Sequence, residues 1–216
     1  MHVYTSTSQA AGGPDELAAT AIEALTPLER EQSKGFSEKR LREFALGRLL
    51  ARRCLQDAGA QSSSREGIGI GPDRGPQWPD GIVGSISHCP GAFAAIVGHN
   101  ASLAGIGIDV EAQQEISPGI LEAVLRSDEG HDDALVKFSA KESLYKLWAP
   151  IMGQWLDFSE ASVRLVECSE QLSGHRAGEI EYTLHTEEPT PEVFSRVKGL
   201  WLAGPDLVAT AAWINA

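Results

Sequence analysis

Two long segments with helical periodicity, each followed by short alternating segments, dominate the pattern of apolar and polar residues. In residues 37–58 one helical face carries Leu41, Phe44, Ala45, Ala51 and Leu55. In residues 134–149 the buried stripe consists of Val136, Ala140, Leu144 and Leu147. We expect Gly59 to close the first helix and Pro150 to stop the second.

Runs of apolar and β-branched residues, separated by turn signals, predict the strands. We expect residues 82–88, 92–97 and 102–111 to form an antiparallel meander after the first helix. Four further strands are expected at residues 162–167, 178–185, 193–202 and 207–214. A long helix followed by antiparallel strands therefore occurs twice, without a strict sequence repeat. This order predicts an α+β fold of two similar lobes, residues 1–111 and 112–216.

Shorter elements are expected elsewhere. Residues 2–5 fit a short strand, residues 15–25 a helix, and residues 119–125 another short helix. Thr26 and Pro27 have the types favoured at the cap and first position of a helix. No pattern predicts the path of the acidic tract 128–133.

The segment GIGIDVE, residues 105–111, contains the first candidate site. Alternate residues of a strand share a face, so Asp109 and Glu111 project together, roughly 7 Å apart along the chain. The glycines before them leave that face bare, and we expect the bulk of a ligand to lie there. Adjacent carboxylates with only oxygen donors suit Mg²⁺. The alternative is a strand end with two solvated acids.

Charged residues on the two long helices add further candidates. Glu142 and Lys146 are four residues apart, outside the buried stripe, and can reach one ligand or form a surface ion pair. Two similar lobes would place Glu111 and Glu142 near their common seam. Arg48 and Arg52 fall on the apolar face of the first helix and need an anion, either a bound phosphate or a carboxylate. For Arg52 we expect the carboxylate.

Composition narrows the classes of function. The 216 residues are 42% hydrophobic and 22% charged, as in ordinary globular proteins. A net charge of −12 argues against binding to nucleic acid or to an anionic membrane. The three cysteines, Cys54, Cys89 and Cys168, show no disulfide or metal spacing, which favours a reducing cytoplasm. No segment has the apolar length of a signal core or a membrane span.

Several ordered motifs together carry a family resemblance. The segment 78–81 (WPDG) leads into 84–89 (GSISHC), then 107–111 (GIDVE), and then 138–146 (FSAKESLYK) with 148–150 (WAP) behind it. Upstream, Lys39, Arg40, Glu43, Phe44 and Gly47-Arg48 match a basic helix. Over about residues 30–166 the chain resembles the Sfp-type 4′-phosphopantetheinyl transferases, the larger pseudo-dimeric branch of that superfamily. It is most similar to the enterobactin-synthetase type and its actinobacterial relatives.

The resemblance implies transfer of phosphopantetheine from coenzyme A to a serine of an apo carrier protein, releasing 3′,5′-ADP. It implies Asp109, Glu111 and Glu142 as Mg²⁺ ligands. The residues that it implies for binding coenzyme A are Arg40, Arg48, Arg74, Gly75, Ser87, His88, Lys141 and Lys146. Chemistry adds two roles: Lys146 beside the leaving phosphate, and Glu142 as the base for the serine proton, directly or through a water.

The resemblance also implies partners and leaves alternatives open. We expect carrier domains of polyketide, peptide or siderophore synthesis as substrates, and a monomer, because one chain encodes both lobes. A second reading is a regulatory module that binds coenzyme A without turnover. A third is a metal-dependent phosphohydrolase, which would need a further carboxylate or histidine to position water.

Overall fold

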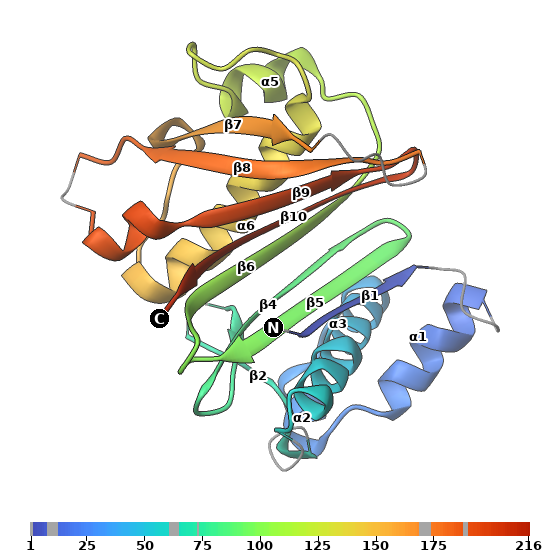
Figure 1. Ribbon diagram of the computed structural model, residues 1–216. Coiled ribbons are helices and arrows are strands. Elements are labelled where there is room, and N and C mark those ends of the chain that lie inside the picture. The colour runs from blue at the N-terminus through green and yellow to red at the C-terminus, as the bar shows by residue number, and fades with distance from the viewer. Residues whose placement is uncertain (1, 8–12, 61–64, 73, 169–173, 188–189) are drawn as a thin grey trace. The chain divides into compact units, whose positions relative to one another are not determined.

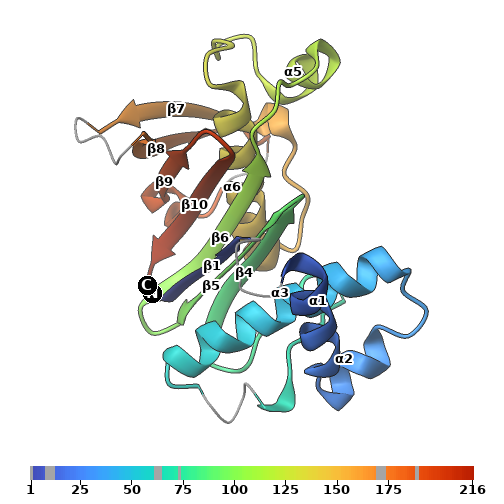
Figure 2. The ribbon, with the colours of Figure 1, turned by 90° about the vertical axis from the view of Figure 1, so that its right-hand side faces the viewer.

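The computed structural model describes residues 2–7, 13–60, 65–72, 74–168, 174–187 and 190–216. It divides the chain into two compact units, residues 1–102 and 103–216. Each unit combines one long helix with an antiparallel sheet (Figures 1 and 2). This architecture confirms the α+β fold predicted from the sequence. Within the described part of the chain, no helix has both the length and the apolar character needed to cross a bilayer.

The first unit is built around helix α3, Glu38–Asp57. Ser37 caps it by accepting a hydrogen bond from the Arg40 amide, and Gly59 follows with φ of 82°, as expected. The helix packs against a sheet of order β1-β5-β4, formed by His2–Thr7, Ala92–His99 and Ile82–Cys89. Helices α1, Gly13–Glu23, and α2, Pro27–Gln32, precede it, and β2, Gly69–Ile70, pairs with β3, Pro76–Gln77.

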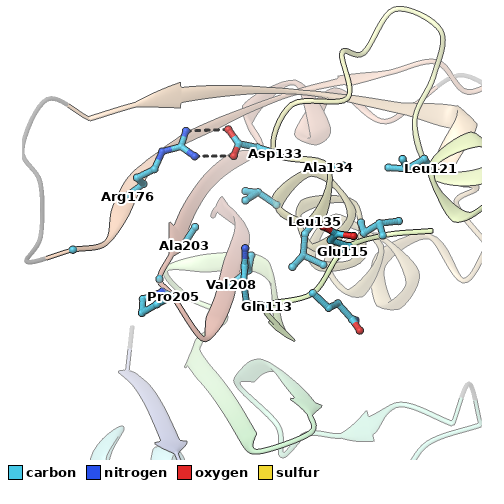
Figure 3. Close-up of a pocket in the computed structure, with 15 residues that line it drawn as sticks. Gln113, Glu115, Leu121, Asp133, Ala134, Leu135, Arg176, Ala203, Pro205 and Val208 are labelled. Atoms are coloured by element: carbon cyan, nitrogen blue, oxygen red, sulfur yellow. Dashed lines mark hydrogen bonds and ion pairs between the residues drawn. The ribbon is translucent and has the colours of Figure 1, made fainter. Parts of the chain in front are cut away.

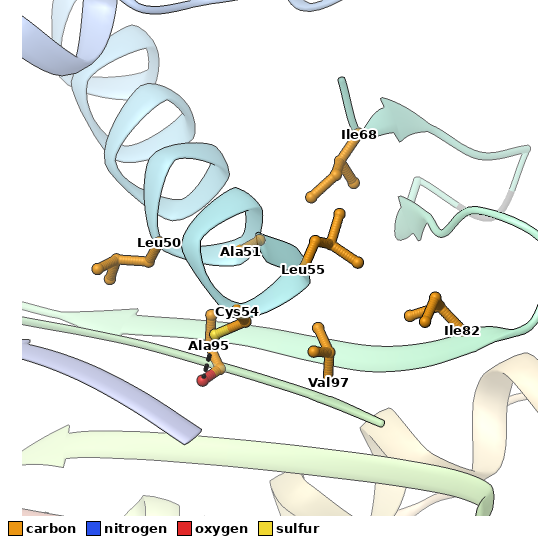
Figure 4. Close-up of a cluster of buried hydrophobic side chains, with 8 residues drawn as sticks. All are labelled: Leu50, Ala51, Cys54, Leu55, Ile68, Ile82, Ala95 and Val97. Atoms are coloured by element: carbon orange, nitrogen blue, oxygen red, sulfur yellow. Dashed lines mark hydrogen bonds between the residues drawn. The ribbon is translucent and has the colours of Figure 1, made fainter. Parts of the chain in front are cut away.

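The apolar stripe of α3 forms the core of this unit. Figure 4 shows Leu50, Ala51, Cys54 and Leu55 of the helix against Ile68, Ile82, Ala95 and Val97. Gly47 allows close approach, because an added Cβ would lie only 3.0 Å from Ile86 of β4. The helix therefore fixes the strand that carries the predicted Ser87 and His88.

The second unit is a five-stranded antiparallel sheet of order β6-β10-β9-β8-β7. Its strands are Leu103–Ala112, Leu207–Asn215, Lys198–Ala203, Arg176–Leu184 and Ala161–Glu167, in that order. Helix α6, Ala134–Met152, lies along one face of the sheet, mainly against β6 and β10 (Figure 1). The short helices α5 (Pro118–Val124), η1 (Phe158–Glu160) and η2 (Glu192–Arg196) complete the unit.

The sequence prediction of a three-strand meander is wrong in its third strand. Strands β4 and β5 pair as expected, but β6 pairs with β10, and Asp109 lies opposite Thr210. The units accordingly divide after residue 102, before the strand that the prediction placed in the first lobe. Partner choice between apolar strands is a long-range property, which local alternation does not encode.

Two other expectations need correction. Helix α6 continues through Pro150 to Met152 and ends at Gly153, whose φ is 64°, because a proline in the last turn removes only one helical hydrogen bond. The segment predicted as a strand at residues 193–202 begins as the 3-10 helix η2, and β9 starts at Lys198. The other predicted helices and strands are present within a few residues of their expected bounds.

Helix α6 fills the glycine face of β6, where the sequence predicted ligand bulk. A Cβ added to Gly107 would lie 2.0 Å from the Ser143 carbonyl oxygen and 2.8 Å from the Leu147 nitrogen. The glycine thus lets the helix backbone approach the strand directly. This contact places Glu142 and Lys146 of α6 beside the acidic end of β6.

Candidate active site

Asp109 is the most constrained acid of the predicted site. Its Oδ1 atom lies 2.6 Å from Lys146 Nζ, and its Oδ2 accepts a hydrogen bond of 2.8 Å from the Ser139 hydroxyl. The carboxylate is buried, whereas the side chain of Lys146 is 26% exposed. The Asp109–Lys146 pair is therefore shielded from solvent on the side of Ser139 and accessible to solvent on the side of Lys146.

Glu111 and Glu142 lie close enough to Asp109 to alter one another's ionisation. Burial, followed by repulsion from Asp109, raises the pKa of Glu111 to about 7; Glu142 adds to this and Lys146 opposes it. Burial also raises the pKa of Glu142, with Lys146 opposing and Asp109 adding to the rise. The three acids and one lysine thus share a local field, in which added positive charge would stabilise the ionised acids.

The acids do not form a complete metal centre by themselves. Among the residues that the structure describes, no three His, Cys, Asp or Glu side chains gather closely enough to surround an ion. Asp109 also has a salt bridge to Lys146. The donors are nevertheless all carboxylate oxygens with a shared excess of negative charge, the type that suits Mg²⁺ when water and phosphate complete its shell. The residues therefore fit this ion as partial ligands.

Lys141 does not fit its predicted role in binding coenzyme A. Its side chain is buried, and Nζ donates to Glu129 Oε2 at 2.5 Å, to the Val124 carbonyl at 2.7 Å and to the Phe158 carbonyl at 3.0 Å. An ammonium has three N–H donors, and these contacts use all of them. Lys141 instead ties α6 to the end of α5, to η1 and to the acidic tract that the sequence left unassigned.

Arg48 is also held by the protein itself. Its Nε donates to the Ile68 carbonyl at 2.7 Å, an Nη donates to the Gly69 carbonyl at 3.2 Å, and its guanidinium stacks 4.5 Å from the Phe44 ring. Burial lowers the pKa of Arg48 to about 10. These contacts give Arg48 a structural task at strand β2. For Arg52 the expected carboxylate is found: it forms a buried salt bridge with Glu29.

The other predicted basic residues of the first unit are more accessible. Arg40 is exposed on the first turns of α3, with its guanidinium 5.7 Å from the Phe36 ring. Arg74 is exposed in the turn between β2 and β3 and adopts a left-handed φ of 67°. Beside it, the Gly75 carbonyl accepts a 2.8 Å hydrogen bond from the Gly71 amide. Both arginines can therefore contact an anion from solvent.

Strand β4 sends Ser87 and His88 to opposite faces, because they are consecutive. His88 lies on the face that packs on α3: its Nε2 is 3.9 Å from Glu43 Oε2, and its ring centroid is 5.5 Å from that of Phe93. Their side chains therefore leave the strand in different directions.

Two pockets of the second unit differ in their relation to the predicted site. One of about 590 Å³ lies between residues 113–116, the start of α6 and the turn after β9, with the Asp133–Arg176 ion pair at its edge (Figure 3). Of the described residues that line it, none belongs to the predicted set. A cleft of about 10 Å³ adjoins Glu142, with Tyr145 and the 67% exposed Trp155 in its wall.

Comparison with known proteins decides the family. Residues 29–98 match the model of the 4′-phosphopantetheinyl transferase N-terminal domain, and residues 105–196 match that of the 4′-phosphopantetheinyl transferase superfamily. The chain belongs to this superfamily. It is an enzyme that uses coenzyme A as co-substrate and modifies carrier proteins.

Named relatives support this assignment over most of the chain. The 4′-phosphopantetheinyl transferase Svp of Streptomyces mobaraensis is 35% identical, over 90% of this chain and 80% of that protein. The 4′-phosphopantetheinyl transferase PptT of Mycobacterium tuberculosis is 32% identical, over 87% of this chain and 86% of that protein. Enterobactin synthase component D of Salmonella typhi is 34% identical, over 55% of this chain and 53% of that protein.

Sequence reasoning missed the residues around the predicted acids. Ser139 was visible inside the motif FSAKESLYK, and Thr210 as the polar residue amid the run VATAAWI. A buried hydroxyl needs a hydrogen-bond partner, but the sequence pattern does not reveal which residue supplies it. In the transferase the Ser139 hydroxyl donates to Asp109, and the Thr210 hydroxyl contacts Ser139.

Proposed function

We propose that this transferase is Mg²⁺-dependent and that Asp109, Glu111 and Glu142 hold the ion, with water and the diphosphate of coenzyme A completing its shell. The observation that carries the proposal is the placement of the acids: Asp109 is buried 2.6 Å from Lys146 Nζ of α6, Glu111 follows on the same face of β6, and Glu142 lies one turn before Lys146. The raised pKa of Glu111, caused by burial and by repulsion from Asp109 and Glu142, supports it. Such a cluster needs a cation to remain fully ionised near neutral pH. When bound, Mg²⁺ would neutralise the diphosphate and orient it for displacement.

Glu142 is the proposed base. The serine oxygen of the carrier forms a bond to the pantetheine-side phosphorus, the diphosphate bond to that phosphorus breaks, and 3′,5′-ADP departs with the bonding electrons. The serine proton passes to Glu142, directly or through a water. A bound cation would keep the Glu142 carboxylate ionised, so that it is available to accept this proton.

Lys146 is the proposed partner of the leaving phosphate. Its ammonium holds Asp109 at 2.6 Å and remains partly exposed, so the same group can also donate to a phosphate oxygen. A fixed positive charge beside an oxygen that gains negative charge lowers the barrier to displacement. Glu142 and Lys146 lie one helical turn apart on α6, which supports their acting on the same substrate.

The proposed coenzyme A contacts of the first unit are Arg40, Arg74, Gly75, Ser87 and His88. The exposure of Arg40 and Arg74 supports contacts with phosphate from solvent. For Arg48 the backbone contacts support an indirect part, in which it holds the β2 segment before the Arg74 turn. Lys141 has an indirect part as well, through the position of α6 beside η1.

The proposed acceptors are carrier domains of polyketide, non-ribosomal peptide or siderophore synthesis. Similarity to enterobactin synthase component D supports this choice within the family. We further propose that the enzyme is a cytoplasmic monomer. Cys54, Cys89 and Cys168 form no disulfide, which fits a reducing compartment.

Mass spectrometry of an apo carrier protein incubated with the enzyme, coenzyme A and Mg²⁺ tests the proposal. We expect a phosphopantetheine mass gain on the carrier, its loss with EDTA, and its recovery with excess Mg²⁺. Transfer that continues in EDTA would refute the metal site. Release of 3′,5′-ADP without a modified carrier would indicate a phosphohydrolase, and binding of coenzyme A without any product would indicate a regulatory module.

A further inference from the structure

Two buried hydroxyls form a chain that ends on the Asp109 carboxylate. Ser139 Oγ lies 2.8 Å from Asp109 Oδ2, and Thr210 Oγ1 lies 3.0 Å from Ser139 Oγ and 2.8 Å from the Ser139 carbonyl oxygen. The exposed fractions are 2% for Asp109, 0% for Ser139 and 2% for Thr210. The chain thus links three elements, β6, α6 and β10.

The direction of the hydrogen bonds follows from the ion pair. Asp109 is bound to the Lys146 ammonium, and an ionised carboxylate only accepts. Ser139 must therefore give its single hydroxyl proton to Oδ2. Thr210 then donates towards the Ser139 oxygens, either the hydroxyl or the carbonyl. The chain runs from Thr210 through Ser139 to Asp109.

The hydroxyl of Thr210 is not required by packing. Thr210 is directly opposite Asp109 in the β6–β10 pairing, so both side chains lie on the face towards α6. Its neighbours on that face of β10, Val208 and Ala212, are apolar and buried. Valine has the shape of threonine without the hydroxyl and would suit this environment, since burying a hydroxyl costs free energy unless it is hydrogen-bonded. The Thr210 hydroxyl therefore serves to orient Ser139 and, through it, the Asp109 carboxylate.

We infer that Ser139 and Thr210 are positioning residues that fix the Asp109 carboxylate with Oδ1 directed to Lys146 and to the proposed metal. The inference rests on the proposed metal site. Neutral donors hold Oδ2 without cancelling the charge of the carboxylate, which stays available to a cation at Oδ1. Such outer partners of a ligating carboxylate typically change metal affinity by about 10–100-fold when removed.

Mn²⁺ binding, followed by electron paramagnetic resonance in the presence of coenzyme A, tests the inference without turnover. We expect Ser139→Ala and Thr210→Val to weaken Mn²⁺ binding by about tenfold. In the carrier assay the half-saturating Mg²⁺ concentration should rise in parallel, while the maximal rate largely recovers at high Mg²⁺. Thr210→Ser keeps a hydroxyl and should stay near wild type.

Ser143→Ala is the matched control. Ser143 is fully buried on the same helix, but its hydroxyl donates to the Ala140 carbonyl at 2.9 Å and not to Asp109. Its loss should leave Mn²⁺ affinity unchanged. If Ser139→Ala does not fold, the pair Thr210→Val and Thr210→Ser carries the test, because the first keeps the shape of the side chain and the second keeps the hydroxyl.

Wild-type Mn²⁺ affinity in folded Thr210→Val and Ser139→Ala would overturn the inference, even if both variants melt at lower temperature. The variant Asp109→Asn shows whether such a result contradicts only the positioning role of the hydroxyls or the proposed metal site as well. If Asp109→Asn loses Mn²⁺ while the hydroxyl variants keep it, only the positioning role fails. If Asp109→Asn also binds Mn²⁺ normally, the proposed metal site itself is refuted.

Discussion

Lys141 Nζ and Glu129 Oε2 form a 2.5 Å ion pair in which both side chains are almost fully buried, at 2% and 3% exposure. The carboxylate also accepts from the Arg126 amide at 2.9 Å and, through Oε1, from the Val163 amide at 2.8 Å. The pair thus joins the acidic tract, α6 and β7 in one network. Lys141 directly precedes Glu142, so the same network fixes the turn of helix that carries the proposed base.

Breaking this pair should destabilise the protein strongly. We expect Lys141→Met to lower the free energy of unfolding by on the order of 3–5 kcal/mol, because Glu129 would remain buried without its counter-charge. Urea unfolding measures the loss. The control is Arg164→Met: Arg164 pairs with Glu181 on the surface, where both side chains are more than half exposed, and should change stability by less than about 1 kcal/mol. Equal effects of the two variants would contradict the assignment of Lys141 as a buried structural residue.

The double variant Lys141→Met with Glu129→Leu separates the buried charge from the loss of contacts. Replacing both charges by apolar side chains removes the unpaired carboxylate, and we expect recovery of part of the lost stability. Transfer activity should recover less, because the hydrogen bonds to the acidic tract and to β7 are also lost. A double variant no more stable than Lys141→Met would show that the unpaired charge is not the cause.

Gly107 should be intolerant of any side chain. An alanine Cβ there would meet the backbone of α6 at Ser143 and Leu147, which cannot rotate away. We expect Gly107→Ala to destabilise the protein by at least about 1–3 kcal/mol. Gly119→Ala, on α5 with open space around the new Cβ, is the control and should be tolerated. Thermal unfolding measures both; a Gly107→Ala protein as stable as wild type would mean that α6 does not approach β6 this closely.

These cases show what local sequence patterns predict and what they leave open. The stripe and cap of α3 are local, so its bounds could be predicted, and the alternation of β6 correctly put Asp109 and Glu111 on one face. The bare glycine face was also a correct observation. The sequence could not predict what covers this face, because a helix backbone and a ligand both require the absence of a side chain at Gly107.

Long-range partners account for the other differences. The apolar environment of Arg48 indicated that its charge needed compensation, but two backbone carbonyls provide the contacts that a phosphate was expected to make. Lys141 has the residue type of a phosphate ligand, yet it pairs with Glu129, which lies in a tract whose sequence shows no periodicity. Side-chain type and spacing identify a need for a partner, and tertiary structure decides between partners.

Arg40 and Arg48 should therefore behave differently when replaced by alanine. Arg40→Ala should raise the KM for coenzyme A with little change in stability, because the guanidinium is exposed. Arg48→Ala should lower the free energy of unfolding by about 1–3 kcal/mol, since two buried carbonyls lose their donors. Transfer kinetics together with urea unfolding distinguish the two effects. An Arg48→Ala protein of normal stability with a raised KM would restore the direct phosphate contact.

Asp133 should contribute stability that depends on pH. Bidentate hydrogen bonds from Arg176, at 2.7 and 2.9 Å, hold the pKa of Asp133 below its usual value. A carboxylate whose pKa is lower in the folded state stabilises the protein above about pH 4, and the contribution vanishes as the pH falls through the lowered pKa.

Asp133→Asn removes this contribution while tolerating the left-handed φ of 53° at the position. We expect a loss below about 1 kcal/mol at pH 7, because both partners are partly exposed, and convergence with wild type under acid conditions. Urea unfolding at several pH values measures it, and Asp132→Asn, an exposed neighbour, controls for the loss of a charge as such. A difference in unfolding free energy between Asp133→Asn and wild type that grows towards low pH would contradict the lowered pKa of Asp133.

Glu142→Gln should abolish transfer without unfolding the protein. Glutamine keeps the shape of the side chain on α6 but cannot accept the serine proton, so we expect a fall in rate of about 10²–10⁴-fold even at saturating Mg²⁺. Carrier modification followed by mass spectrometry gives the rate, and coenzyme A binding shows whether the substrate site survives. Glu179→Gln, an exposed position on β8, is the control. Turnover at the wild-type rate by folded Glu142→Gln would show that Glu142 is not the base. If Glu142 is the base, the residual rate of the variant should not depend on the ionisation of a carboxylate at this position.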